Sequence, residues 1–392
     1  MTGPHAHRQR SSSLRAATSV LAAAATAAAL LLAGAPGANA ATGPGRAPDI
    51  SDPIALLAAL APDLAAQTSS SGLGVQDPAT FSVTLPGDSR GEIGLRPTVT
   101  EGSGQATSIR LADQDDTVVE GRVQGGITVF DQGASATYVQ PLASGVRLLT
   151  AYADASTGGD RAFELDLPDG ATATALPTGD TVVADAEGRY IGSVLQPWAK
   201  DATGRDLPTS YSWEGDVLTQ HVDLSDAVFP VLADPTWYYS YDFWAGLPGY
   251  HAKVPKTDES TAVAMLHNCF NCYFPIGNAP RAYPNDGDII NLNASPFSFI
   301  VLPAPVKVQT AMGGALQFVA ARGHFDGAGS MITFSWYNDA SGYLHLYVHA
   351  MVLRDLGTVV NAHNALIAGT NWLTFWQRVV DRVSPSGGAG GV

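Results

Sequence analysis

Two residues that could form a general base lie close together in the segment GHFDGAG, residues 323–329. A carboxylate such as Asp326 that hydrogen-bonds one ring nitrogen of His324 would leave the other free to accept a proton. With His349, expected nearby on the sheet, they are the candidate catalytic residues. The segment also has a structural interpretation, because Asp326-Gly327 is a favoured turn dipeptide. The turn is the preferred interpretation, and the run G-A-G-S-M-I lacks the second glycine of a G-x-S-x-G nucleophile motif.

A group of polar aromatic residues follows in YLHLYVHAMV, residues 343–352. This segment and SMITFSWY, residues 330–337, flank NDASG, whose length and glycine predict a β-hairpin. Because side chains alternate along a strand, the face opposite the apolar one carries both histidines. The candidate binding residues on it are Tyr337, Tyr343, His345 and Tyr347, since such side chains stack on sugar rings and form hydrogen bonds. The alternative is that preceding strands or the last helices bury this face.

The only two cysteines form the motif C-F-N-C at residues 269–272. A disulfide between Cys269 and Cys272 is favoured, because export to an oxidising compartment is expected and this spacing at a helix end suits the bond. A redox pair is disfavoured, since the dipole at a helix C-terminus opposes a thiolate. Zinc would need a ligand beyond these cysteines and His267. His345 and His349 would lie about 13 Å apart along a strand, so we predict no metal and no cofactor.

The elements that position these residues are expected to form an α+β domain over residues 237–383. A helix is predicted over residues 257–270, followed by an antiparallel sheet that includes FSFIVL, VKVQT, ALQFVAA and the hairpin. Two terminal helices then follow. The first ends at Gly369, and the second is capped by Thr370 and carries an aromatic stripe at helical spacing.

The preceding region, residues 80–236, alternates with period two in short segments such as FELDL at residues 163–167. Turn signals such as PGD and PDG separate these segments, so the region is predicted to be an all-β, sandwich-like middle domain. It holds 23 acidic and 9 basic residues, a balance of −14, whereas residues 237–392 hold 9 and 8. Nucleic acid is therefore excluded as a partner, because binding phosphate needs a basic face.

The first 40 residues have the organisation of a secretory signal peptide. Three arginines precede an apolar run over residues 20–33, and Ala38-Asn39-Ala40 is a small-x-small cleavage site. We expect cleavage after Ala40, a secreted chain and no membrane insertion, since the run is shorter than the ~20 residues a spanning helix needs. Residues 41–79 are expected to be a linker with one short helix, capped by Ser51 and ended by Pro62. Residues 384–392 are expected to be a disordered tail.

The β-rich region closes on FPVLADPTW, residues 229–237. It resembles the β-rich segment, ending in Pro-Val-x-x-Asp-Pro-Thr, of secreted actinobacterial multidomain proteins. The resemblance implies a scaffold that presents a variable C-terminal module, and it carries no catalytic residue over to this chain. We therefore expect an extracellular or cell-envelope binding module, with cell-wall or environmental glycan as its partner. The alternative is an exported hydrolase or toxin-like effector that uses His324, Asp326 and His349.

Overall fold

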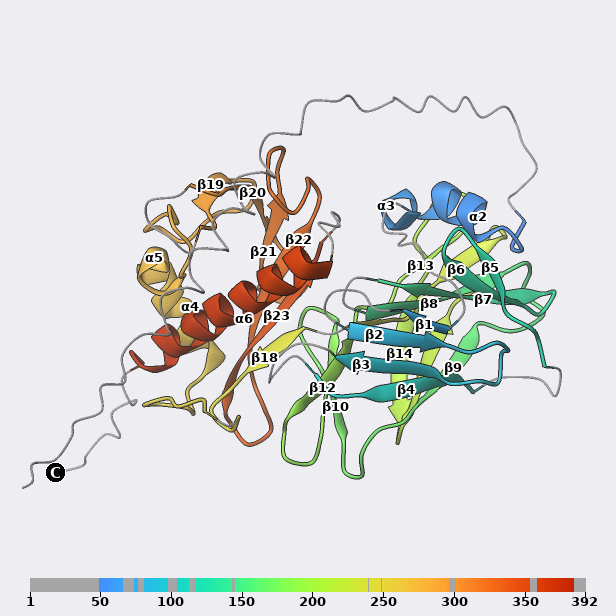
Figure 1. Ribbon diagram of the computed structural model, residues 1–392, viewed down its shortest axis with the longest axis horizontal. Coiled ribbons are helices and arrows are strands. Elements are labelled where there is room, and N and C mark those ends of the chain that lie inside the picture. The colour runs from blue at the N-terminus through green and yellow to red at the C-terminus, as the bar shows by residue number, and fades with distance from the viewer. Residues whose placement is uncertain are drawn as a thin grey trace, which may run out of the picture. The chain divides into compact units, whose positions relative to one another are not determined.

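Three antiparallel sheets and a few helices make up this protein in the computed structural model (Figure 1). The fold class expected from the sequence, a β-rich region followed by an α+β region, is confirmed. The structure describes residues 49–65, 74–76, 81–97, 104–112, 118–142, 145–238, 240–247, 249–295, 301–352 and 358–383. The predicted signal peptide, much of the predicted linker and the predicted disordered tail lie outside the described residues.

The first two sheets pack face to face. The first has the order β1 (Gly74–Gln76), β2 (Phe81–Leu85), β3 (Ile93–Pro97), β4 (Thr107–Leu111), β9 (Asp160–Leu165), β15 (Val217–Val222) and β14 (Thr209–Glu214). The main path of the second is β10 (Thr172–Ala175), β11 (Thr181–Ala184), β12 (Tyr190–Val194), β17 (Thr236–Tyr238), β8 (Gly145–Tyr152), β7 (Ser135–Pro141), β6 (Ile127–Asp131) and β5 (Arg122–Gln124). Two short strands, β13 (Ala199–Lys200) and β16 (Val231–Ala233), join it beside β8.

One buried apolar cluster joins these two sheets. Phe163 and Leu218 enter it from the first sheet, and Leu148 and Trp237 enter it from the second. In FELDL, the alternation of buried Phe163 and Leu165 with half-buried Glu164 between them follows from the pleat of a strand with one face in a core. The arrangement is that of a β-sandwich.

The predicted short helix is present as α2 (Pro53–Leu60), followed by α3 (Pro62–Ala65). Its N-cap is Asp52 and not Ser51, because the Asp52 carboxylate accepts the backbone N–H of Ala55 at 3.0 Å. The fully buried Leu56 and Leu57 pack in a cluster with residues of β6, β7 and β8. The helix therefore belongs to the β-rich fold, although the sequence suggested only a linker around it.

The motif that closes the β-rich region has a structural explanation in Asp234. This carboxylate is fully buried, and its Oδ1 accepts the backbone N–H of Trp198 at 2.9 Å and the amide of Gln220 at 3.0 Å. It thereby joins the segment after β12 to β15. The next residues form β17, which lies between β12 and β8, so the strand that crosses the expected boundary at 236 and 237 belongs to the second sheet.

The third sheet has the order β18 (Tyr241–Phe243), β23 (Leu344–Met351), β22 (Met331–Asn338), β21 (Leu316–Ala320), β20 (Pro303–Thr310) and β19 (Ile289–Asn293). Helices α4 (Glu259–Asn268), α5 (Phe270–Tyr273) and α6 (Thr358–Val380) pack on one face of it, with the short turn η2 (Met312–Gly314) before β21. The predicted hairpin of β22 and β23 is confirmed, with Asn338 opposite Leu344. Its apolar face forms a core with Phe375 and Trp376 of α6.

The two terminal helices predicted from the sequence are one continuous helix, because α6 runs through Gly369 and Thr370. A Cβ at Gly369 would lie 3.0 Å from the ring of Tyr241 on β18. The glycine therefore allows the helix to approach the sheet closely, and it does not end the helix.

The predicted disulfide geometry is present at Cys269 and Cys272, with Cα atoms 5.4 Å apart. Cys269 ends α4 and precedes α5, so the bridge fixes the turn between the two helices. Among the described residues, no helix has the length and apolar character needed to cross a bilayer.

Candidate functional site

The expected binding face of tyrosines and histidines is buried. The solvent-exposed fractions of Tyr337, His345 and Tyr347 are 7%, 3% and 0%. Within the compact unit Ala47–Val392, Tyr337 and Tyr347 share an apolar cluster with Tyr190 of the second sheet. An exposed platform for stacking on sugar rings is therefore absent at these three positions. Residues of the β-rich region pack on the two tyrosines, and the ring of Trp244 stacks on His345.

His345 is held in a buried charged cluster. Its Nδ1 lies 2.8 Å from Asp242 Oδ2 and 3.1 Å from the Tyr337 hydroxyl, and its Nε2 lies 3.4 Å from Asp339 Oδ2. Burial acts to lower the pKa of His345, but attraction to Asp242 and hydrogen bonds to both carboxylates outweigh it and raise that pKa to about 9. The imidazole is therefore protonated at neutral pH and links β23 to β18.

Tyr343, the fourth predicted binding residue, is half-buried and directly precedes β23. Its ring meets Trp244 edge-on with centroids 5.2 Å apart, and the Lys256 ammonium lies 4.5 Å from its centroid. Trp244 also stacks on His345 at 5.2 Å, so it covers the charged cluster. These contacts engage Tyr343 in local packing.

The predicted catalytic pair does not have the geometry of an oriented base. His324 Nδ1 and Asp326 Oδ2 are 3.9 Å apart, while the backbone N–H of Asp326 donates to the same Nδ1 at 3.1 Å. Because Nδ1 accepts a hydrogen bond, it carries no proton to donate to the carboxylate. Burial lowers the pKa of His324 to about 4 and raises that of Asp326 to about 6. The segment is a series of turns, as its glycines suggested, with Gly327 N–H donating to His324 O.

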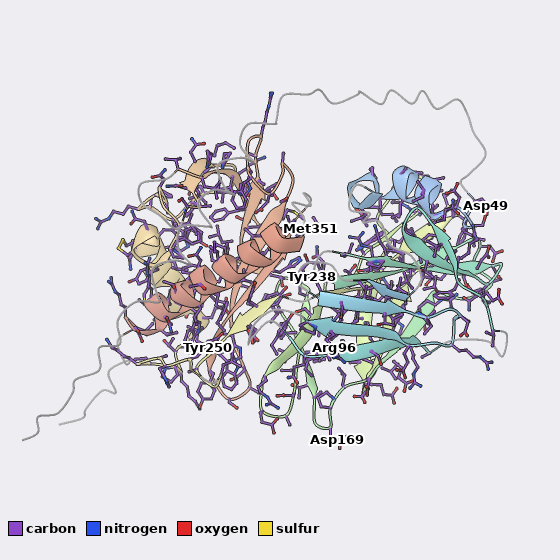
Figure 2. The ribbon with its side chains drawn as sticks, viewed as in Figure 1. Asp49, Arg96, Asp169, Tyr238, Tyr250 and Met351 are labelled. Carbon is purple, nitrogen blue, oxygen red and sulfur yellow. A yellow bond between two sulfur atoms is a disulfide. The ribbon has the colours of Figure 1, made fainter. Side chains whose placement is uncertain are left out.

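His349, the third predicted catalytic residue, packs against the β-rich region. Its ring meets that of Tyr238 edge-on with centroids 4.9 Å apart. The Tyr238 hydroxyl donates to the carbonyl of Ala350, which precedes Met351 (Figure 2). Within the described ranges the buried Nε2 of His349 has no hydrogen-bond partner, and burial lowers the His349 pKa to about 4.

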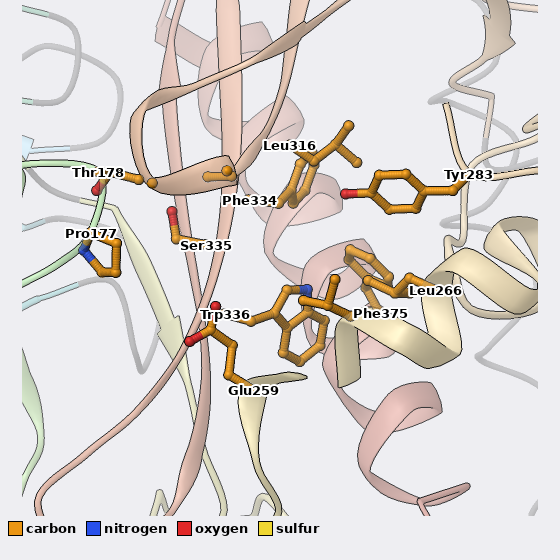
Figure 3. Close-up of a pocket in the computed structure, with 14 residues that line it drawn as sticks. Pro177, Thr178, Glu259, Leu266, Tyr283, Leu316, Phe334, Ser335, Trp336 and Phe375 are labelled. Carbon is orange, nitrogen blue, oxygen red and sulfur yellow. The ribbon is translucent and has the colours of Figure 1, made fainter. Parts of the chain in front are cut away.

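A pocket opens beside β22, at the point where its neighbour β21 begins (Figure 3). Leu316, the first residue of β21, pairs with Phe334, whereas β22 continues to Asn338. The empty space amounts to about 460 Å³, part of which is open to solvent. Apolar side chains from α4, β21, β22 and α6 line most of it, namely Val263, Leu266, Leu316, Phe334, Trp336 and Phe375.

Polar groups lie at the edges of this pocket. The buried Oγ of Ser335 has no hydrogen-bond partner among the described residues, and it leaves β22 on the face opposite Phe334. Glu259 enters from the first turn of α4, and burial raises the pKa of its carboxyl. Tyr283 points its hydroxyl toward Leu316 (Figure 3). A mostly apolar pocket with a few polar groups is the usual form of a small-ligand site.

The wall of the pocket next to Ser335 is made by the loop of η2 and by Pro177 and Thr178 of the β-rich region. Gly313 has a φ of 70°, and a Cβ there would lie 2.5 Å from Pro177 atoms. Both the backbone conformation and this close approach therefore require glycine. The pocket needs the two regions to be in contact at this point.

The residues of the charged cluster and of the pocket were largely missed from the sequence. The partners of His345 are far apart in the sequence. Asp242 lies on β18 and Asp339 in the turn after β22, and no local sequence pattern connects them. The Gly-Gly pair at residues 313–314 was a visible signal of an unusual turn. In the described ranges, no group of three or more histidine, cysteine, aspartate or glutamate side chains is placed to hold a metal ion.

Comparisons with known proteins show a distant likeness to a solved structure. No family model and no curated protein matches the chain. Among solved structures, the chain is similar to a di-domain aromatase/cyclase from the steffimycin biosynthetic pathway. The two are 8% identical, with a TM-score of 0.27 and coverage of 69% of this chain and 86% of the other.

Proposed function

We propose that this protein is an exported binding module that takes the apolar part of a small, uncharged ligand into the pocket beside β22. The observation that carries the proposal is the buried, unpartnered hydroxyl of Ser335 at the edge of an apolar pocket. Leaving a buried polar group without a partner costs about 1–3 kcal/mol. A ligand that forms a hydrogen bond with the Ser335 hydroxyl would remove this cost.

The charge of the protein restricts the ligand. Glu259 stands at the edge of the pocket, and the whole chain has a net charge of −15. An anion would be repelled by both, so the proposed ligand is neutral. Because the 460 Å³ includes space open to solvent, the pocket would enclose only part of the ligand. The remainder of the ligand would lie outside. A glycan platform is not proposed, since three of its four residues are buried.

The binding test uses N-phenyl-1-naphthylamine, a neutral fluorescent probe, with the mature chain. Val263 lines the pocket and is half-buried, so Val263→Phe fills the space with little effect on the core. The matched control is Ala264→Phe, at an exposed position of the same helix. We expect saturable fluorescence with the wild type and the control, and affinity at least tenfold weaker for Val263→Phe. Equal binding by both variants, or no saturable binding by the wild type, would overturn the proposal.

Export is tested separately by mass spectrometry of the protein in the culture medium. The proposed signal peptide predicts a mature chain beginning at Ala41. The control replaces Ala38 and Ala40 with bulky residues, which should block processing, because the cleavage site needs small side chains. Recovery of an uncleaved chain inside wild-type cells would contradict the proposal of export, and it would leave the pocket experiment unaffected.

A further inference from the structure

Three side chains on the exposed face of the first sheet form a connected Ser-His-Asp arrangement. Ser212 Oγ lies 2.7 Å from His221 Nε2, and His221 Nδ1 lies 2.9 Å from Asp160 Oδ1. They come from three adjacent strands, β14, β15 and β9. In the register His221 is opposite Asp160 on one side and Ser210 on the other, so Ser212 reaches the ring from two residues along the strand.

The hydrogen bonds fix where the protons lie. An ionised carboxylate can only accept, so Asp160 must receive the proton on His221 Nδ1. In the neutral imidazole Nε2 is then a free acceptor, and the hydrogen of the Ser212 hydroxyl points to it. This is the order of roles by which a serine is activated as a nucleophile. His324 and Asp326 lack this order, because their Nδ1 accepts a backbone N–H.

The strand pattern keeps the serine accessible. Along β14 the residues alternate, with Ser210, Ser212 and Glu214 exposed, while Tyr211 and Trp213 pack on the inner core. The side chains of His221 and Asp160 remain 42% and 71% exposed. A substrate could therefore reach Ser212 without any movement of the protein.

A donor for a developing oxyanion is available at the sheet edge. The backbone N–H groups of an antiparallel strand point alternately to one neighbour and to the other. Asp223 N–H donates to Pro208 O, whereas Val222 N–H donates to Gly159 O on the opposite side. In the same alternation along β14, the N–H of Trp213 points away from β15. In the described part of the first sheet, β14 is the outermost strand on this side. The N–H of the residue after the nucleophile is a common oxyanion donor in serine hydrolases.

We propose that Ser212, His221 and Asp160 form a second site that hydrolyses small, uncharged carboxylic esters. Ser212 Oγ adds to the carbonyl carbon while its proton passes to His221 Nε2. The intermediate then breaks the bond to the alkoxy oxygen, which leaves as the alcohol with that proton. Water adds to the acyl-serine, gives a proton to Nε2, and releases the acid as Oγ regains its proton. Ester and water become acid and alcohol, with no change in oxidation state.

The open setting determines the substrate class. The face around Ser212 is an exposed sheet surface, so little binding energy comes from the acyl group. The exposed carboxylate of Glu214 lies on the same face as Ser212, which disfavours anionic esters. Short, neutral acyl groups with good leaving alcohols are therefore the expected substrates. This site does not depend on the pocket beside β22.

The test combines covalent labelling with turnover. The mature protein is treated with a fluorophosphonate, which phosphonylates an activated serine with loss of fluoride, and the modified residue is located by peptide mass spectrometry. Hydrolysis of p-nitrophenyl acetate is measured in parallel. The variants are Ser212→Ala and, as the matched control on the same strand and face, Ser210→Ala. Both serines are exposed, so neither change should affect folding.

We expect the adduct at Ser212 in the wild type and in Ser210→Ala. Turnover should be at least tenfold lower in Ser212→Ala, with wild-type turnover in the control. Asp160→Asn should lower turnover and leave the adduct at the same residue, formed more slowly. The absence of an adduct at Ser212, or wild-type turnover by Ser212→Ala, would overturn the proposal.

Discussion

The stability of this protein should carry a pH dependence that originates at His345. The folded state raises its pKa to about 9 from an ordinary value of 6.5. A group with a raised folded pKa contributes stability that is fully present below the unfolded value and is lost as the pH rises through the folded one. A difference of this size corresponds to about 3 kcal/mol, and the side chain is only 4% exposed, so solvent screening removes little of it.

The perturbation that isolates this contribution is His345→Gln. Glutamine keeps a donor for Asp242 and much of the volume, but it does not titrate. The free energy of unfolding is measured with urea for the wild type and the variant at pH 6, 7.5 and 10. The wild type should exceed the variant most at pH 6, and the difference should fall by about 3 kcal/mol by pH 10.

Other titrating groups change both proteins alike, so the difference between the two curves reports the replaced histidine and the groups that face it, Asp242, Asp339 and Tyr337. His251→Gln, at an exposed histidine outside the cluster, controls for the loss of a histidine as such. A difference that stays constant from pH 6 to pH 10 would refute the reasoning, because it would mean that His345 is not charged in the folded state.

Three further predictions concern stability. Gly313→Ala should destabilise the protein by roughly 2 kcal/mol or more, whereas Gly314→Ala, with φ of 82° but nothing within 4 Å of its Cβ, should cost only about 1 kcal/mol in urea unfolding. Replacing both cysteines with serine should lower the free energy of unfolding by about 2 kcal/mol, the loop entropy of so short a bridge. Burial raises the pKa of Asp234 to about 7, so its contribution to stability is lost as the pH rises through 7. Asp234→Asn should therefore gain roughly 3 kcal/mol relative to the wild type between pH 5 and pH 8, and a flat difference would contradict this.

The local pattern of the sequence was sufficient for the strands and their faces. In the hairpin of β22 and β23, alternation placed Phe334 and Leu346 on one face and Tyr347 on the other, as observed. What covers the second face depends on strands more than a hundred residues earlier, and no local pattern contains that information. The expectation that this face is exposed was wrong for this reason.

Gly369 illustrates a different limit. A glycine after an amphipathic segment is a common helix stop, so the local sequence predicts that the helix ends here. Here the contact with Tyr241 on β18, far away in the sequence, explains the residue, and the helix continues. Tertiary packing outweighs a helix cost of about 1 kcal/mol.

The exposed Ser-His-Asp arrangement was only partly accessible to sequence reasoning. The segments TSYSWE and VLTQHV are separated by a Gly-containing turn, so a hairpin with Ser212 near His221 could have been predicted. Asp160 could not, because its strand pairs with β15 only through the order of the folded sheet.

The position of β17 determines where the C-terminal part could be exchanged for another. A chain that ends at Pro235 would leave β8 and β12 without the strand that lies between them, and it would expose backbone donors and acceptors of both. A chain that continues through Tyr238 keeps the second sheet complete. The C-terminal part could therefore be exchanged without loss of this strand only after residue 238. The unit that must be kept together therefore ends with β17, one residue beyond the motif FPVLADPTW.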